Sequence, residues 1–201
     1  MFCVGGDIAS FAAAGHGAPA HLKRITASLH VAVARLARMG KPLVAVVHGP
    51  AAGAGMSLAL LGDIVLAGTS AHFTTAYGRI GLSPDGAMSW LLPRLVGLRR
   101  AQDLLFTNRR VLSDEALALG LVTRVEADER LAEAGAEMAR ELARGPTPAI
   151  AMARQLLLDA YGSAPETQME REARGIADAV RHEHGRAGIA AFLAKETAVF
   201  S

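Results

Sequence analysis

The feature that most constrains this fold is a short β-branched run that leads directly into a loop of small residues. Residues 43–47 read LVAVV, a continuous apolar run with the length of a buried strand. The loop at residues 49–55 contains only glycine, alanine and one proline, and an apolar helix is expected over Met56–Leu61. Two further apolar runs, Asp63–Ala67 and Ala71–Thr75, are typical of strands. This order predicts an α/β protein with parallel pairing.

Most of the remaining sequence has a helical pattern. Apolar residues recur at helical spacing from Leu22 to Met39, and Gly40 closes that pattern. Further helices are expected over residues 99–107, 113–119, 128–143, 147–160, 165–181 and 186–195, with a short strand over residues 121–125. Ser113 is expected to cap its helix and Gly120 to end it. The break at Gly145-Pro146 predicts an α/β core over residues 1–144 and a helical region over residues 145–201.

Composition excludes several classes of protein. The 201 residues are 51% apolar, which is enough for a sizeable core. The net charge of +2 comes without a run of lysine and arginine, so nucleic-acid binding is not expected. One cysteine, Cys3, excludes an internal disulfide and indicates an intracellular, cytoplasmic protein. No apolar run approaches the roughly 18 residues of a membrane span, and the start does not resemble a signal peptide.

Three loops have the composition to carry chemistry. Gly49–Gly55 lets a ligand approach the backbone and opens a helix whose first N–H groups are unpaired. It lacks the lysine of a phosphate-binding P-loop, and Leu58 stands where a dinucleotide fingerprint has its third glycine. The other two are residues 5–7, which read GGD after an apolar stub, and residues 81–86, where Asp85 lies between proline and glycine. Taken alone, each loop is also compatible with a tight turn or a helix cap.

The ordered set of motifs is far more specific than any one loop. The segments are VGGDI at residues 4–8, KPLVAVVHGPAAGAGMSLALLGDIVLAG at 41–68, HFTTAYGRIGLSPDGAMSWLLPRLVG at 72–97, LSDEALALGLVTRV at 112–125 and GIAAFLAKETAVF at 188–200. Together they resemble the crotonase (enoyl-CoA hydratase/isomerase) superfamily over nearly the whole chain. The resemblance implies the family's ββα spiral core, followed by a C-terminal helical region used for oligomerisation. Family members have strands and a helix before the first motif, so the expectation is a chain truncated at its N-terminus or a true start further upstream.

The resemblance also implies an oxyanion hole, in which two backbone N–H groups hold a thioester oxygen as it becomes an enolate. By position, these donors are the N–H groups of Gly6 and Ala54. Fixed amides aimed at a developing charge supply several kcal/mol of transition-state stabilisation. The neighbours Gly5, Asp7 and Gly53 are expected to help bind the substrate. The substrate is an acyl-CoA, so coenzyme A enters as part of the substrate and no separate cofactor is expected.

Two departures from the family pattern favour one activity. Hydratases of the family carry two glutamates, and this chain has Ser57 and Tyr77 at those positions. Asp85 instead matches the general base of the family's Δ3,Δ2-enoyl-CoA isomerases. The motifs around it are most similar to members that isomerise 2-(1,2-epoxy-1,2-dihydrophenyl)acetyl-CoA in phenylacetate catabolism. The prediction is therefore an isomerase that shifts a double bond or rearranges a ring epoxide, with Asp85 as general acid and base.

Three alternatives stay open from the sequence. An atypical hydratase is one, and a truncated member of impaired activity is another. The third is a thioesterase using Ser57, which would need an adjacent base, and His48 is the nearest candidate in sequence. Ser57, Tyr77 and Trp90 are also candidates to line the acyl pocket.

The C-terminal region carries two further expectations. Lys195 matches a basic residue on the family's closing helix that approaches the phosphates of coenzyme A. The family forms trimers or pairs of trimers through these helices, and four apolar residues fit such an interface: Ile189, Phe192, Leu193 and Phe200. The histidines His72, His182 and His184 show no metal-ligand neighbours in the sequence, so no metal site is predicted.

Overall fold

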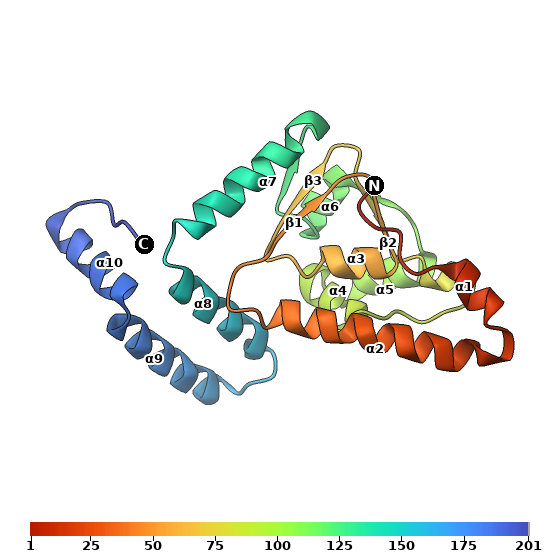
Figure 1. Ribbon diagram of the computed structural model, residues 1–201, viewed down its shortest axis with the longest axis horizontal. Coiled ribbons are helices and arrows are strands. Elements are labelled where there is room, and N and C mark those ends of the chain that lie inside the picture. The colour runs from red at the N-terminus through yellow and green to blue at the C-terminus, as the bar shows by residue number, and fades with distance from the viewer. Residues whose placement is uncertain (201) are drawn as a thin grey trace. The chain divides into compact units, whose positions relative to one another are not determined.

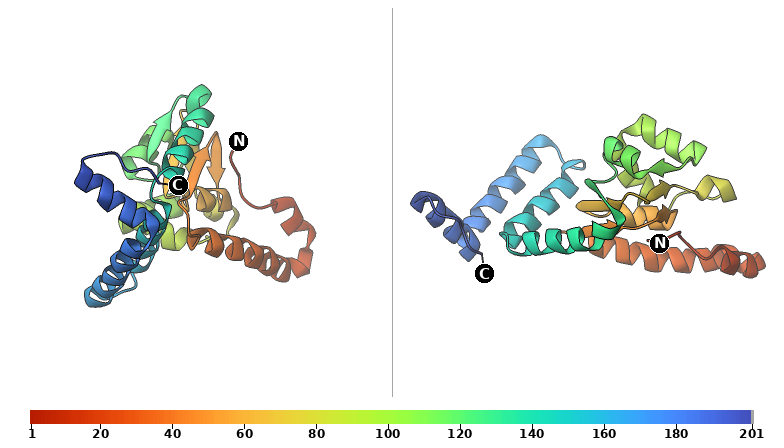
Figure 2. Two further views of the ribbon diagram at one scale, coloured as in Figure 1. Left: turned by 60° about the vertical axis from the view of Figure 1, so that its left-hand side comes forward. Right: turned by 90° about the horizontal axis from the view of Figure 1, so that it is seen from above.

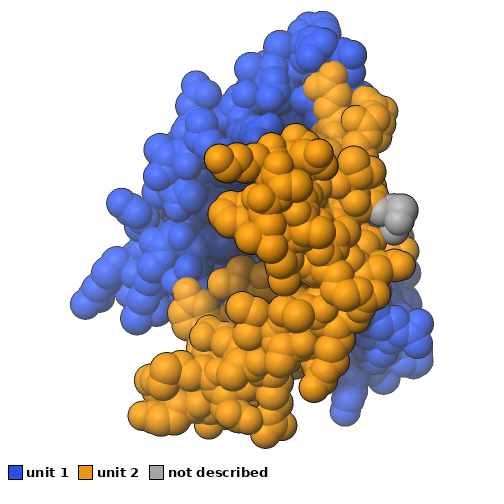
Figure 3. Space-filling model, turned by 90° about the vertical axis from the view of Figure 1, so that its left-hand side faces the viewer, with its two compact units in different colours: residues 1–36, 43–135 blue, residues 37–42, 136–201 orange. Residues whose placement is uncertain are grey.

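The computed structural model describes residues 1–200, which form two compact units (Figure 3). Unit 1 consists of residues 1–36 and 43–135, and unit 2 consists of residues 37–42 and 136–200. The sequence predicted a division after residue 144, whereas the compact units divide inside helix α7 (Asp128–Ala143). The short segment 37–42 also belongs with unit 2, although unit 1 precedes and follows it in the chain.

Two small sheets form the centre of unit 1 (Figure 1). The first has the strand order β1 (Val44–Val47), β3 (Ile64–Gly68) and β6 (Arg124–Glu126). The second has the order β2 (Pro50–Ala52), β4 (His72–Thr74) and β5 (Val111–Leu112). Pairing is parallel between β1 and β3, β3 and β6, and β2 and β4, which confirms the predicted parallel arrangement. The antiparallel pairing of β4 with β5 was not predicted.

Part of the small-residue loop is a strand in the structure. Residues 50–52, expected to be loop, form β2 because they pair with β4 on one side and with Cys3, in the N-terminal residues 1–4, on the other. On that side the N–H of Cys3 donates to the carbonyl of Pro50 at 3.2 Å, and the N–H of Ala52 donates to the carbonyl of Cys3 at 2.9 Å. Among the described residues, residues 1–4 form a single bridge, Cys3 to Ala51.

Most helices of unit 1 lie beside these sheets, whereas the helical segment at residues 8–17 extends away from them (Figures 1 and 2). Their bounds are α1 (Ile8–Ala13), η1 (Gly15–Gly17), α2 (Ala18–Ala37), α3 (Ala54–Ala59), η2 (Tyr77–Ile80), α4 (Met88–Val96), α5 (Leu98–Thr107), α6 (Ser113–Leu119) and α7. The helix α4 was not predicted from the sequence, because it contains Pro93, and a proline inside a helix removes one backbone donor and is usually taken as a break. Ser113 begins α6 but does not cap it, since its hydroxyl donates instead to the carbonyl of Thr69 at 3.1 Å.

The core of unit 1 lies between the sheets and the helices α3, α4 and α5. Its largest fully buried side chains include Met56, Leu66, Phe73, Leu92 and Leu104. Burial of each such side chain contributes roughly 1.5–3 kcal/mol. Because Met56 comes from α3, this packing fixes the helix that follows the small-residue loop.

Unit 2 is helical. It contains α8 (Thr147–Ala160), α9 (Pro165–Arg181) and α10 (Glu183–Ala194), together with the last turns of α7. The predicted ranges of α8 and α9 are confirmed, and α10 begins three residues before its predicted start at Arg186. In the part of the chain that the structure describes, no helix combines the length and the apolar character needed to cross a membrane.

Candidate active site

The N-terminal segment lies directly against the loop that opens α3. A side chain at Gly5 would place its Cβ 3.2 Å from the carbonyl oxygen of Ala52 and 3.5 Å from the backbone nitrogen of Ala54, and the φ of Gly5 is +95°. At Gly55 a Cβ would overlap the carbonyl of Cys3. Glycine at these two positions therefore allows the close approach of the two segments expected to hold a substrate oxygen.

The two expected oxyanion donors carry unused N–H groups. Ala54 is the first residue of α3 and follows Gly53, which has a φ of +54°. Neither the N–H of Gly6 nor that of Ala54 donates to an acceptor within residues 1–200. Because the first N–H groups of a helix have no partner inside the helix, the Ala54 donor is free to bind an added oxygen. The structure thus brings Gly5, Gly6, Gly53 and Ala54 together.

Asp7 fixes the chain just after Gly6. Its Oδ1 accepts hydrogen bonds from the N–H of Ala9 at 3.0 Å and of Ser10 at 3.2 Å, so Asp7 is the N-cap of α1. The hydroxyl of Ser10 donates a hydrogen bond to the carbonyl of Asp7 at 2.9 Å. Asp7 was predicted to bind substrate, and its observed contacts are those of a helix cap that holds the Gly6 segment.

The three side chains at the remaining key positions form one hydrogen-bonded cluster. The hydroxyl of Tyr77 donates to Oδ1 of Asp85 at 2.7 Å. The hydroxyl of Ser57 lies 3.2 Å from the Tyr77 oxygen and donates to the backbone carbonyl of Asp85 at 3.0 Å. Ser57 is fully buried, whereas Tyr77 and Asp85 are partly exposed. Among the described residues no donor bonds Oδ2 of Asp85, so one carboxylate oxygen is anchored and the other is available.

Burial raises the pKa of the Tyr77 phenol well above its usual value. The adjacent Asp85 adds to this rise through its hydrogen bond and its charge, while the hydrogen bond with Ser57 opposes it. A phenol in this setting stays protonated at neutral pH. Tyr77 is therefore a permanent donor to Asp85 and has no basic form with which to activate water.

The helix α3 links the two halves of the site. Ala54 and Ser57 are three residues apart, so they lie on one face of the helix. The N–H that could hold an oxygen and the hydroxyl that contacts Asp85 are thus carried on one helical turn.

One contact of the Asp85 turn was not predicted from the sequence. The N–H of Gly86 donates to Nε2 of His30, on α2, at 3.2 Å. Gly86 follows Asp85 directly, so His30 contacts the same turn as Ser57. No signal in the sequence marks His30, because a histidine on an amphipathic helix is usually a solvent-facing residue.

Other predicted residues do not join the cluster. The ring of Trp90 is 38% exposed, and the guanidinium of Arg94 lies 3.9 Å over it, so Trp90 is neither core nor a partner of Asp85 in the described structure. His48 is exposed, and the hydrogen bonds of the Ser57 hydroxyl go to Tyr77 and to backbone carbonyls, so the serine–histidine pair that the alternative hydrolase would need is not formed. Lys195 belongs to unit 2, where it is exposed and ends α10 with a φ of +59°.

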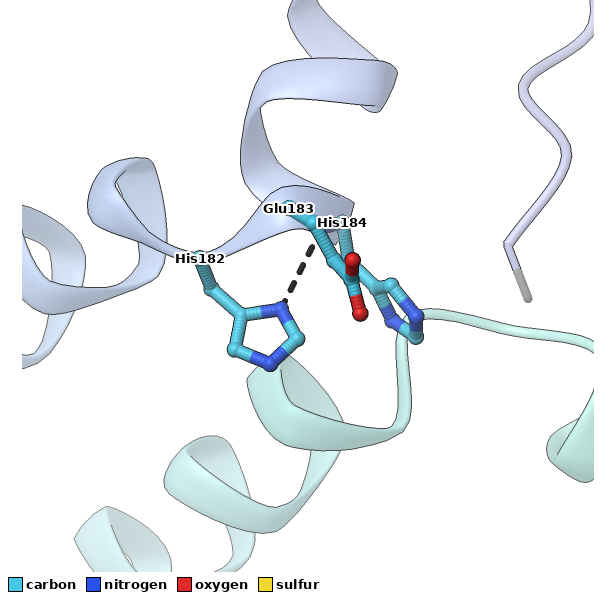
Figure 4. A group of neighbouring side chains, drawn as sticks. All are labelled: His182, Glu183 and His184. Atoms are coloured by element: carbon cyan, nitrogen blue, oxygen red, sulfur yellow. Dashed lines mark hydrogen bonds between the residues drawn. The ribbon is translucent and has the colours of Figure 1, made fainter.

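Unit 2 holds a separate group of polar side chains (Figure 4). One possible metal-ligand atom from each of His182, Glu183 and His184 lies within 4.8 Å of the others. The sequence had predicted no metal-ligand neighbours for these histidines. Nδ1 of His182 accepts the N–H of His184 at 3.2 Å, which makes His182 the N-cap of α10. The observed role of His182 in this group is therefore to cap the N-terminus of α10.

The fold and the site together define a class of protein: an α/β chain with two unpaired backbone N–H groups, at Gly6 and Ala54, and a carboxylate held by a tyrosine, at Asp85. The sequence pattern of one family, described as enoyl-CoA hydratase/isomerase, matches residues 1–201. The chain belongs to this enoyl-CoA hydratase/isomerase family.

Relatives and solved structures agree with that assignment. The chain is 39% identical to a 1,2-epoxyphenylacetyl-CoA isomerase of Escherichia coli (strain K12) over 84% of its length, and 34% identical to 4-chlorobenzoyl coenzyme A dehalogenase-1 of an Arthrobacter species over 83%. It spans 64% and 60% of the lengths of these two curated relatives. The crystal structure of an enoyl-CoA hydratase from Polaromonas sp. JS666 matches with a TM-score of 0.92 at 34% identity, covering 98% of this chain and 76% of that one.

Proposed function

We propose that the protein is an acyl-CoA isomerase that works through a thioester enolate, with Asp85 as the general acid and base. The observation that carries this proposal is the 2.7 Å hydrogen bond from Tyr77 to Oδ1 of Asp85. It holds the Asp85 carboxylate by one oxygen and leaves the other without a donor among the described residues, as a general base requires. The relative named as an epoxyphenylacetyl-CoA isomerase supports the same reaction class.

The first step is removal of a proton from C2 of a 3-enoyl-CoA. The free oxygen of Asp85 takes the proton, and the electron pair of the C2–H bond delocalises onto the thioester oxygen. The N–H groups of Gly6 and Ala54 hold that oxygen as its negative charge develops. Because these donors are fixed backbone groups, they need no reorganisation when the charge forms.

The second step returns the same proton to C4. The dienolate carries electron density at both C2 and C4, so protonation at C4 leaves the double bond between C2 and C3. One carboxyl serves both steps when it lies within hydrogen-bond reach of both carbons. The hydrogen bond from Tyr77 keeps the carboxyl in one orientation during the transfer. With a ring epoxide as substrate, the same hold on the thioester oxygen by the N–H groups of Gly6 and Ala54 favours rearrangement to a seven-membered oxygen heterocycle.

The geometry argues against the other activities considered. A hydratase of this family activates water with carboxylates at positions 57 and 77. This chain lacks both carboxylates, since Ser57 is neutral and Tyr77 stays protonated. A thioesterase acting through Ser57 lacks an imidazole beside the hydroxyl. The proposal therefore includes an acyl-CoA substrate, no separate cofactor, and a role in the breakdown of fatty acids or of phenylacetate.

Assembly into trimers or pairs of trimers is part of the same proposal. Phe192 and Leu193 on α10 are 81% and 76% exposed, which suits a face covered by another copy. Phe200 differs, because its ring packs against His184 of its own chain with ring centroids 5.3 Å apart. Lys195 is exposed and available for a phosphate of coenzyme A.

The test follows the conversion of 3-hexenoyl-CoA by the absorbance of the conjugated enoyl thioester. Asp85→Asn keeps the size of the side chain and an oxygen that accepts the Tyr77 hydrogen bond, but it removes the base. We expect kcat to fall about 100- to 10,000-fold, the usual contribution of a general acid and base. Asp114→Asn is the matched control, because Asp114 is an exposed residue of α6.

The outcomes separate the activities. Isomerisation by the parent and by Asp114→Asn, together with its loss in Asp85→Asn, supports the proposal. An Asp85→Asn protein that isomerises as fast as the parent would overturn the role of Asp85. Release of free thiol without a shifted double bond would identify a thioesterase, and formation of a hydroxyacyl-CoA would identify a hydratase.

A further inference from the structure

Gly86 is the junction between the Asp85 turn, α3 and α2. Its φ is +60°, and a Cβ at this position would lie 2.9 Å from Cβ of Ser57 and 3.6 Å from Cδ2 of Leu29. The residue is buried, and its N–H donates to Nε2 of His30 at 3.2 Å. A small shift of Gly86 would therefore move Asp85 relative to Ser57.

His30 is exposed on α2, whereas Gly86, whose N–H it accepts, is buried. A buried N–H that loses its partner carries a desolvation penalty, so the chain shifts to recover a hydrogen bond. Because a backbone N–H only donates, Nε2 of His30 is the acceptor and the ring proton lies on Nδ1. The contact thus depends on a neutral imidazole with its lone pair aimed at Gly86.

The helix α2 that carries His30 has one buried residue, Val33, and a Cβ at Gly86 would lie 3.6 Å from Cδ2 of its Leu29. Nine residues before His30, the ring of His21 lies 3.3 Å from the hydroxyl of Ser10 and packs edge-on against Phe11 at 6.3 Å between centroids. Phe11 is also the side chain that a Cβ at Gly6 would meet, at 2.7 Å. The helix α2 therefore contacts both the Gly6 segment and the Asp85 turn.

We propose that His30 is a positioning residue that sets the place of the Asp85 carboxylate by accepting the Gly86 N–H. It acts through the backbone and touches no reacting atom. This inference rests on the proposed function for its effect on turnover, but the contact itself has a readout that does not depend on activity. Loss of the acceptor releases the turn, so Asp85 samples positions that reach C2 and C4 less often.

Two substitutions of similar size separate the acceptor from the bulk of the ring. In His30→Gln the side-chain oxygen lies as many bonds from Cβ as Nε2 does, so it replaces the acceptor. In His30→Leu no acceptor remains. The matched control is His16→Leu, since His16 is an exposed residue of η1 with no hydrogen bond to the described residues. All four proteins are compared by steady-state kinetics on 3-hexenoyl-CoA and by amide hydrogen exchange at Gly86.

We expect His30→Leu to lower kcat about tenfold with KM changed less than about twofold, because substrate binding is retained and only the proton transfer is misplaced. Exchange at Gly86 is expected to be about tenfold faster in that variant. His30→Gln and His16→Leu are expected to match the parent within about twofold in both measurements.

Each result decides between the two proposals. Equal Gly86 exchange in the leucine and glutamine variants would overturn the role of His30 even if the isomerase activity is confirmed. A leucine variant with faster exchange but unchanged kcat would equally overturn it. If the parent isomerises nothing, the proposed function fails, and the exchange contrast alone then decides whether His30 holds the Asp85 turn.

Discussion

At the scale of residues, the site is built from a hydrogen bond between two side chains only eight positions apart. Tyr77 and Asp85 meet because the chain between them turns back through η2, with left-handed residues at Ala76 and Gly81. The absence of carboxylates at positions 57 and 77 is visible in the sequence. The use of both hydroxyls to orient Asp85 is not, because it depends on a left-handed alanine that no propensity favours.

The titration of Tyr77 tests this arrangement. The chain has two tyrosines, so Tyr161→Phe leaves Tyr77 as the only phenol. Because burial raises the pKa of Tyr77, we expect its phenolate absorbance to appear only well above pH 10, the ordinary value for tyrosine. An absorbance change with a midpoint near pH 10 would show that Tyr77 is not held in the buried cluster.

The same shift makes a prediction for stability. In the unfolded chain Tyr77 loses its proton at a lower pH than in the folded chain. The stability that the phenol contributes is therefore complete below about pH 10 and is lost as the pH rises toward the folded pKa. Urea unfolding of Tyr161→Phe above about pH 10 should show this loss, and the Tyr77→Phe, Tyr161→Phe protein should lack it. Equal pH slopes in the two proteins would contradict the prediction.

At the scale of elements, the site depends on how α3 sits against the N-terminal segment. The strand at residues 43–47 and a helix after the small-residue loop were predicted from their apolar residues, and the bounds of α8 and α9 followed from proline at their starts. The pairing of residues 50–52 as a strand was not predictable, since alanine and proline are poor strand formers. That pairing exists because Cys3 supplies backbone partners from a distant part of the chain.

Gly55 on α3 tests this packing. A Cβ at this position overlaps the carbonyl of Cys3, which also accepts the N–H of Ala52. We expect Gly55→Ala to push the N-terminal segment away from α3, with a loss of about 1–3 kcal/mol of unfolding free energy. Because Gly6 moves with that segment, kcat for isomerisation should also fall.

The matched control for this change is Gly17→Ala. A Cβ at Gly17 would meet no atom within 4 Å. Its unfolding free energy should stay within about 0.5 kcal/mol of the parent. If Gly55→Ala unfolds and turns over substrate like Gly17→Ala, the close approach of Cys3 to α3 is not a requirement of the site.

At the scale of the whole molecule, the compact units do not follow the order of the sequence. The sequence located a boundary at the Gly145-Pro146 break, and the helices on both sides of it were found where expected. The membership of residues 37–42 in unit 2 was not predictable, because it rests on contacts with residues more than a hundred positions away. A buried arginine on α8 makes these contacts, and a lone arginine in a helix is usually a surface residue.

Arg154 is that residue, and its replacement is expected to free the segment. The side chain is 8% exposed, and its guanidinium donates to the carbonyl of Ala37 at 2.7 Å and of Met39 at 2.9 Å. In Arg154→Leu both carbonyls lose a charged donor, so we expect a loss of about 2–4 kcal/mol of stability in unit 2.

Limited trypsin digestion measures the opening of residues 37–42, because Arg38 is the cleavable site in this segment and Lys41 is protected by Pro42. Cleavage after Arg38 should be faster in Arg154→Leu than in Arg174→Leu, whose side chain is 76% exposed. Equal rates in these two variants would mean that residues 37–42 are held by other contacts.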